Sequence, residues 1–497
     1  MTSNNEDGYK VKVSDEDLTT LLDYKLAQSS ASFLDTSELS DERQKSTYEY
    51  AMIPQGHLKP QGVSRIVSSD TVEAIEGYTA VLSELLFDNN KLAKFKAYDR
   101  TPLALHKATA ASELLNHCLF SKNRGWSVLN TWLKSALMWK LSAVTWTYAS
   151  EEKVSFEEYE VIDSTALDVL LSDPEITTTG DIYLDERSGN YLDVRLKRTK
   201  VTNKVVVSAV PPETLRVGRG ATGIHDASFV GFEEEMTRSE IRERWPEAAE
   251  GVDWSAVESG IHYATQLNTD SLARKQAIGT TLLLGSGDDN QLEATESAVV
   301  LRCWVYVDRD GDGIAELKYI VRVGDTILEE EDADHIQVAT FTPFEIPFEL
   351  EGLSMSDMVR PSTLASTAIL RGFVENTYLT NYAPKIADPN VVDFSALQNM
   401  KPKQIIASNG SPQGAVASLP PEQISTGTVP LLQFLQGHKE QATGLSKAAQ
   451  GLNDALYVSG NSEAKVSQVQ SAAQIRIQFI ARRFMETGGR ELLEGIY

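Results

Sequence analysis

Cysteine is scarce in this chain of 497 residues, which contains only Cys118 and Cys303. Two distant cysteines in apolar surroundings exclude a disulfide scaffold and a cysteine-rich zinc site, and we expect both to be reduced core residues. No stretch approaches the ~18 uncharged apolar residues of a membrane span, and the first residues lack the basic and apolar regions of a secretory signal. We therefore expect a folded protein with no membrane partner.

Positive charge is also scarce. Lysine and arginine together number 46 against 71 aspartates and glutamates, so the formal net charge is −25. Such a chain repels phosphate, which argues against a protein that grips nucleic acid through a broad basic face. An acidic surface also lets DNA pass without sticking, so charge alone does not exclude a protein that surrounds DNA.

Motifs for catalysis and nucleotide binding are missing. The seven histidines form no HExxH pair, and the chain has no GxSxG elbow, Walker A loop, CxxC pair or kinase signature. The glycines at 218, 220 and 223 spell GxGxxG, but no amphipathic helix follows them and the flanking section is β-rich rather than βαβ, so they indicate a turn. We expect no enzymatic activity and no required cofactor.

The first third of the chain is predominantly helical by pattern. Residues 1–58 hold 11 acids and 5 bases and predict a polar N-terminal helical arm. A helical block follows over 70–150, in which Trp132, Trp139 and Trp146 recur every seven residues. This spacing predicts one helix with a buried aromatic face. The alternative, a platform for stacking bases, lacks the basic groove that such sites need.

A β-rich section is predicted over 151–345, where apolar residues alternate in short runs separated by turns. Examples are 191–197, 204–210, 299–307 and 316–323, with one short helix expected near 238–245. Together with the helical segments on either side, this section predicts an α+β fold.

A sequence typical of cation loops occurs between two of these strand-like runs. Asp308, Asp310 and Asp312 alternate ahead of a glycine, and Glu316 follows, so their oxygens can surround a hard cation such as calcium. Tyr319 stands where an EF-hand has its bidentate glutamate, which predicts weak affinity. The alternative is a rigid hairpin turn, because aspartate and glycine tolerate left-handed backbone and bond to their own turns.

Helical periodicity returns in the last third. A long helix is expected over 354–382, with Met358, Ala365, Ile369, Phe373 and Leu379 near one stripe, and with a late start or a kink at Pro361. A second helix is expected over 429–450. After a loop at 451–462, a third helix places Val466, Val469, Ala473, Ile477, Ile480 and Phe484 on one face.

The other face of this third helix is basic. It carries Lys465, Arg476, Arg482 and Arg483, so we consider it a candidate contact for DNA phosphates. A solvated face or pairing between subunits is the alternative reading of the same residues.

Ten segments, in order along most of the chain, resemble the portal proteins of short-tailed bacteriophages, which connect head and tail. They are VSRIVS at 63–68, VPPE at 210–213, TRSE at 237–240, DRDGDGIAEL at 308–317, PFELEGLS at 347–354, LRGFVENTY at 370–378, ATGLS at 442–446, GLNDAL at 451–456, SAAQIR at 471–476 and IARRFMETG at 480–488.

This resemblance implies a map of regions. After the arm come a wing at 59–345, a first stem helix within 346–382, a clip at 383–428, a second stem helix at 429–450, a tunnel loop at 451–462 and a C-terminal helix at 463–497. That helix leads toward a crown that is short or absent. Lys385, Lys401 and Lys403 would belong to the clip, and Asn453, Asp454, Tyr457 and Asn461 to the tunnel loop.

The resemblance also implies partners. Twelve subunits would form a ring at one capsid vertex of the virion, after assembly in the host cytoplasm, and double-stranded DNA would pass through the channel. The terminase large subunit and a head–tail adaptor would dock at the clip, and the major capsid and scaffolding proteins at the wing. The alternative function from another class is a calcium-dependent, β-rich binding or adhesion module that uses the Asp308 loop.

Overall fold

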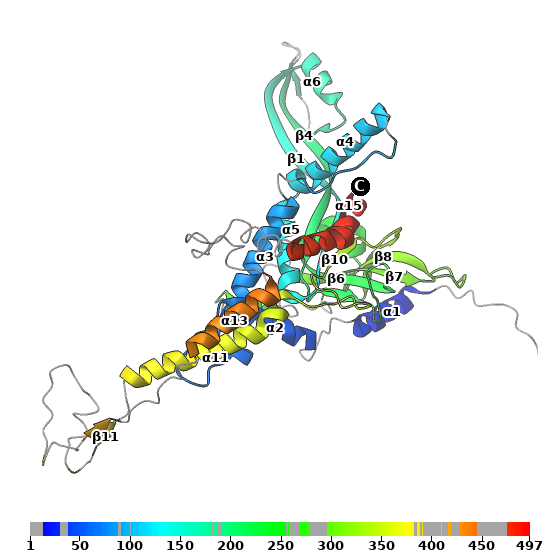
Figure 1. Ribbon diagram of the computed structural model, residues 1–497. Coiled ribbons are helices and arrows are strands. Elements are labelled where there is room, and N and C mark those ends of the chain that lie inside the picture. The colour runs from blue at the N-terminus through cyan, green and yellow to red at the C-terminus, as the bar shows by residue number, and fades with distance from the viewer. Residues whose placement is uncertain are drawn as a thin grey trace, which may run out of the picture.

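The computed structural model describes residues 13–29, 38–87, 91–99, 101–179, 183–185, 190–254, 257, 269–278, 296–381, 385–387, 390, 409, 416–418, 428–444 and 475–497. Three parts extend from a central body in Figure 1: a long β ribbon, a second sheet with a helix beside it, and a pair of long helices. The mixture of helices and sheets confirms the α+β prediction.

The described helices, in chain order, have the following bounds. They are α1 Asp15–Gln28, α2 Glu38–Tyr50, η1 Gly56–Leu58, α3 Asp70–Phe87, α4 Pro102–Asn116, η3 His117–Lys122, α5 Gly125–Trp139, α6 Ser164–Leu171, α7 Arg238–Arg244, α8 Pro246–Ala249, α10 Thr269–Ala277, α11 Met355–Asn381, α13 Thr428–Thr443, η6 Met485–Gly489 and α15 Arg490–Ile496. Among them, none combines the length and the apolar character that crossing a bilayer requires.

The described strands form two five-stranded sheets and one short pair. They are β1 Ser142–Asp163, β2 Ile176–Thr178, β3 Tyr183–Asp185, β4 Asn190–Val210, β5 Leu215–Val217, β6 Phe229–Thr237, β7 Ser297–Val307, β8 Glu316–Val323, β9 Thr326–Asp332, β10 Val338–Phe341, β11 Lys385–Ala387 and β12 Val416–Ser418.

The largest apolar core joins α3, α5, the starts of β1 and α11, and the C-terminal helix. Its centre is aromatic: the ring of Phe484 lies edge-on to Trp132 at 4.7 Å and to Phe341 at 5.0 Å between centroids. Because such edge-to-face pairs add about 0.5–1.5 kcal/mol beyond burial, they fix the C-terminal segment against the body. The predicted apolar positions Ile477, Ile480 and Phe484 are all buried here.

The prediction of one helix carrying three tryptophans is wrong. Helix α5 ends at Trp139, Lys140 adopts a positive φ of 72°, and Trp146 lies in strand β1. The side chains of Trp132 and Ser142 close the reversal by bonding to each other's carbonyl oxygens at 3.2 and 2.9 Å. The expected burial still holds, because Trp132 and Trp146 share the main core and Trp139 packs against it.

The first sheet is built on two strands far longer than the short runs predicted. Its order is β10-β1-β4-β2, with β3 also on β4, and the runs at 191–197 and 204–210 belong to the single strand β4. The antiparallel register runs from Ala143 opposite Val210 to Asp163 opposite Asn190 without a shift. These two strands make the ribbon at the top of Figure 1, and α6 lies against its far end.

The second sheet has the antiparallel order β5-β6-β7-β8-β9. On one face, Leu18 and Leu22 of α1 pack with Cys303 and its neighbours. On the other face, Ile241 of α7 joins a separate cluster, and a capping box at Thr237 begins that helix where a short helix was predicted. Cys303 is buried as expected and burial raises its pKa to about 12, whereas Cys118 is half-buried; both are free thiols.

The long helix α11 begins earlier than its proline suggested. Ser354 caps it, because its Oγ accepts from Asp357 N at 3.1 Å and donates to the Asp357 carboxylate at 2.8 Å. This capping box sets the start at Met355, and Pro361 lies inside the helix. At the far end, Lys385 of β11 is opposite Ser418 of β12, and α13 returns alongside α11 (Figure 1).

The C-terminal segment is not one continuous helix as predicted. It is α-helical over 475–484, forms a π turn in η6, and resumes as α15, with a non-helical φ/ψ of −103°/−108° at Thr487. Close packing explains the break: a Cβ at Gly488 would lie 2.4 Å from Thr340 O and 2.6 Å from the Trp132 ring. The chain therefore turns across β10, and α15 follows it.

Candidate functional site

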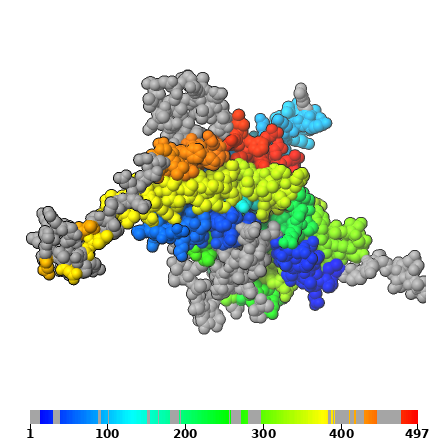
Figure 2. Space-filling view, turned by 60° about the horizontal axis from the view of Figure 1, so that its bottom comes forward, coloured from blue at the N-terminus to red at the C-terminus, as the bar shows by residue number. Residues whose placement is uncertain are grey.

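The portal resemblance points to the helix pair α11 and α13 as its stem. The start of α11 and the end of α13 pack against the central body of the protein. In Figure 2, α11 lies between α13 on one side and N-terminal helices on the other. The buried face of α11 is made mainly of small polar side chains, namely Ser356, Ser362, Thr363, Ser366 and Thr367. Phe373 and Leu379, from the predicted stripe, are instead 45% and 49% exposed in the single chain.

Hydrogen bonds align α11 with the start of α3. The hydroxyl oxygens of Thr71 and Thr363 lie 2.9 Å apart, and Ser68 N donates to Thr367 Oγ1 at 3.0 Å. Small side chains allow the two backbones to approach closely, and each buried hydrogen bond contributes about 1 kcal/mol net. The contact therefore fixes the register of α11 on the body.

Helix α13 is held on the same helix α3. Lys439 Nζ lies 2.7 Å from Asp70 Oδ1 and 2.8 Å from Glu73 Oε2. Burial alone would raise the pKa of Glu73, but hydrogen bonds from Lys439 and Ser69 outweigh it and lower that pKa. One turn farther on, the Tyr78 hydroxyl donates to Thr443 O, and burial raises the pKa of Tyr78 to about 12.

A buried ionic cluster joins α11 to the N-terminal arm. Arg360 Nε lies 2.7 Å from Glu49 Oε1, and its Nη1 contacts Asp357 at 3.0 Å and Glu42. His57 Nε2 lies 2.9 Å from the same Glu49 oxygen. Although burial disfavours the charge on Arg360, the carboxylates led by Glu49 outweigh burial and raise its pKa.

Two of the four cations predicted to contact DNA bind other residues of the same chain instead. Arg476 Nη1 donates to Gln441 O at 2.7 Å and to Ala442 O at 3.4 Å, so it satisfies the last carbonyls of α13. Arg483 pairs with Glu345, and its side chain is 17% exposed. These contacts attach the C-terminal helix to α13 and to the loop before α11.

Arg482 differs from its neighbours. Its side chain is 80% exposed and lies 3.8 Å from the carboxylate of Glu486, which is itself 62% exposed. The fourth candidate, Lys465, lies outside the described residues, as do all four tunnel-loop residues and the clip residues Lys401 and Lys403. The backbone of Lys385 lies in β11 at the far end of α11.

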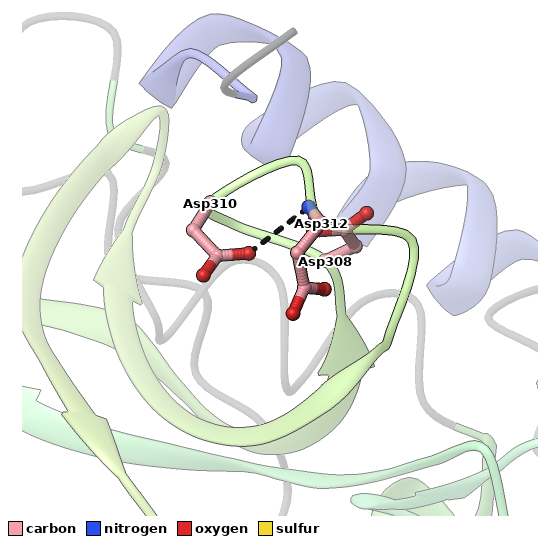
Figure 3. A group of neighbouring side chains, drawn as sticks. All are labelled: Asp308, Asp310 and Asp312. Atoms are coloured by element: carbon pink, nitrogen blue, oxygen red, sulfur yellow. Dashed lines mark hydrogen bonds between the residues drawn. The ribbon is translucent and has the colours of Figure 1, made fainter. Parts of the chain in front are cut away.

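The Asp308 loop connects β7 to β8, as its sequence indicated (Figure 3). Carboxylate oxygens of Asp308, Asp310 and Asp312 lie within 4.8 Å of one another, a spacing that suits one cation. Glu316 is not part of this group: it begins β8, and its carboxylate lies 3.6 Å from Lys318 Nζ.

The same loop also has the bonds of a self-supporting turn. Asp308 accepts from the backbone N–H of Gly311 at 2.7 Å, Asp312 at 3.1 Å and Gly313 at 2.7 Å. Desolvation would raise the pKa of Asp308, but these donors outweigh it and hold the pKa below its ordinary value. The carboxylate group could hold a weakly bound cation, while the backbone bonds already order the loop.

The buried ion pairs were missed by reasoning from the sequence. Glu49 and Arg360 are 311 positions apart, and Lys439 is 369 positions from Asp70. The one local signal is the i,i+3 spacing of Asp357 and Arg360, which is common on helix surfaces. Nothing in a single sequence connects these distant charges.

Comparison with known proteins assigns the family. The chain belongs to the family of the phage SU10 portal protein, whose sequence model matches residues 18–497. It is therefore a podovirus-like portal protein of a phage, as the resemblance implied. Among curated proteins, none matches the chain significantly.

Proposed function

We propose that twelve copies of this chain form a ring at one capsid vertex and that double-stranded DNA passes through its central channel during packaging and ejection. The family match over residues 18–497 carries this proposal. The net charge of −25 supports it, because a channel whose wall carries part of these acids repels phosphate and keeps DNA mobile. The role is structural: a separate ATP-driven motor supplies the work.

The regions of the chain divide these tasks. The wing is 59–345, the stem consists of the helices within 346–382 and 429–450, the clip is 383–428, and the tunnel loop is 451–462. The pairing of α11 with α13, and of β11 with β12 at their far end, supports the stem and clip assignments (Figure 1). The 463–497 segment leads toward the crown.

Each region has its own partners in this proposal. The clip binds the terminase large subunit during packaging and the head–tail adaptor afterwards. The wing contacts the major capsid and scaffolding proteins, so the assembled ring belongs to the virion after its assembly in the host cytoplasm. Arg482 and Lys465 are the cations that we assign to transient phosphate contacts, since Arg476 and Arg483 have partners in the chain.

The test compares capsids assembled with and without this protein. Purified motor, ATP and DNA are added, and DNA protected from nuclease is measured. We expect protection only in capsids that contain the protein. Equal protection in capsids that lack it would overturn the proposed function.

A further inference from the structure

The two long strands of the β ribbon carry opposite charge. Strand β1 contains six acidic residues and one lysine, a balance of −5, whereas β4 contains five basic residues and one aspartate, a balance of +4. Because the strands lie side by side, the ribbon has one acidic edge and one basic edge on both of its faces. Pairs across the ribbon, such as Glu158 with Arg195 at 3.0 Å, are largely exposed and only partly neutralise this difference.

The acidic edge has no strand beside it for most of its length. In the described part of the chain, β10 pairs with β1 over 142–145, and the outer side of 146–163 faces no other strand. At ~3.4 Å per residue, this free edge is about 60 Å long. Long unprotected edges promote association, so soluble proteins usually shorten or cover them.

The basic edge is covered in part. Strands β2 and β3 pair with β4 within 190–198, and the Asn123 side chain bonds to Val205 O at 2.8 Å and Val207 N at 3.1 Å. Between these two covers lies the exposed residue Lys200. This edge therefore presents positive charge where the ribbon leaves the body.

One face of the ribbon also carries apolar side chains that no segment covers in the part of the chain that the structure describes. Tyr148, Val154, Phe156 and Val201 point to the same side of the register and are 66%, 44%, 64% and 49% exposed. The opposite face is covered near its far end, where Leu167 of α6 packs with Val194 and Leu196.

We propose that the ribbon is a contact between neighbouring copies of this chain: the acidic β1 edge of one copy lies against the basic β4 edge of the next. A ring needs two different, complementary patches on each subunit, and the two edges supply them. DNA would bind the basic edge and be repelled by the acidic one, whereas a second copy matches both. The inference rests on the ring of the proposed function.

Two charge-reversed variants test it. Replacing Glu157, Glu158 and Glu160 by Lys changes the β1 balance from −5 to +1, so both edges are basic. Replacing Arg195, Lys197 and Lys200 by Glu changes the β4 balance from +4 to −2, so both edges are acidic. We expect each variant alone to show at least about a tenfold lower fraction of rings by mass photometry, the change that ~1.4 kcal/mol would cause. An equimolar mixture should recover rings in which the variants alternate, since a ring of twelve closes with alternating subunits.

The controls separate this inference from the proposed function. Lys107→Glu, on the exposed helix α4, should form rings like the wild type, and circular dichroism should show that all variants are folded. Rings from either reversed variant alone, or failure of the mixture to recover them, would overturn the inference. If a reversed variant forms normal rings that no longer enter capsids, the ribbon contacts a capsid protein rather than a neighbouring copy, and the inference is overturned. Absence of rings from the wild type would count against the proposed function itself.

Discussion

Arg360 and Glu49 form a buried ion pair in which Nε lies 2.7 Å from Oε1 and the glutamate side chain has no exposed surface. The pair joins α2 of the N-terminal arm to the first turns of α11, and Glu42 and Asp357 contact the same guanidinium. An uncompensated buried charge is costly, so each partner requires the other. The N-terminal arm is therefore part of the support for α11.

The first prediction concerns this pair. Replacing Arg360 by Met removes the guanidinium from buried Glu49 and leaves His57 as its neighbour, so we expect the free energy of unfolding to fall by about 3–5 kcal/mol. Urea denaturation measures this change in the free energy of unfolding. Arg482→Met, which removes an 80% exposed side chain, is the matched control and should change stability by less than ~0.5 kcal/mol. Equal effects of the two substitutions would show that the buried pair is not a support.

A pH prediction follows from Glu213, which is 6% exposed and pairs with Arg274. Burial would raise its pKa, but the hydrogen bonds and charge of Arg274 outweigh burial and lower the folded pKa. A lowered pKa means that the pair contributes stability above the ordinary glutamate value of about 4.3 and loses it as pH falls through the folded pKa.

Glu213→Gln should consequently be less stable than the wild type at pH 7, and the difference should shrink below about pH 4. Denaturation midpoints at several pH values measure this. Glu247→Gln, on helix α8, serves as the control for a generic loss of charge. A difference that stays constant down to pH 2 would contradict the assigned pKa direction.

The third prediction distinguishes a cation site from a rigid turn. Asp308→Ala removes the acceptor for three backbone N–H groups, so we expect a lower melting temperature without any calcium. Asp310→Ala removes one such contact and should have a smaller effect. Calcium at about 1 mM, enough for weak sites, should not shift the wild-type melting temperature. A shift that Asp308→Ala abolishes would instead establish a cation site.

The fourth prediction concerns deletion of 451–462. The contact of Arg476 with Gln441 O holds the described ends of this connection, at 444 and 475, close to each other. Because the ends are already fixed, a shorter connection should leave the fold and the ring intact. Packaging or retention of DNA should fall, as measured by nuclease protection. Loss of the ring on deletion would contradict the tunnel-loop assignment.

The sequence predicted those helices and strands whose pattern of apolar and polar residues can be recognised within a few consecutive positions. Strand β8 and helix α7 were found because alternation and capping residues are visible in short windows. The reversal at Lys140 was missed, because the apolar spacing of Trp132, Trp139 and Trp146 suits a helix even though β-branched residues surround Trp146. The long strand β4 was divided because Val201 is the one apolar residue in its middle, 198–204, so the alternation of apolar and polar residues is lost there.

The charged contacts of the site could not be predicted in this way. Arg476 and Arg483 looked like two residues of one basic face, yet one bonds to α13 and the other to Glu345. Their roles depend on which segments the fold brings beside the C-terminal helix, and that helix is broken at Thr487 by packing against β10 and Trp132. Family resemblance identified the portal family, whereas the structure separated the arginines that have partners in the chain from the exposed one.

The most direct test of the central claim is electron microscopy of the purified protein, with its mass in solution measured alongside. The account predicts rings of twelve subunits with a central hole wide enough for double-stranded DNA, and a mass twelve times that of one chain. Particles without a central hole, at any mass, would contradict it.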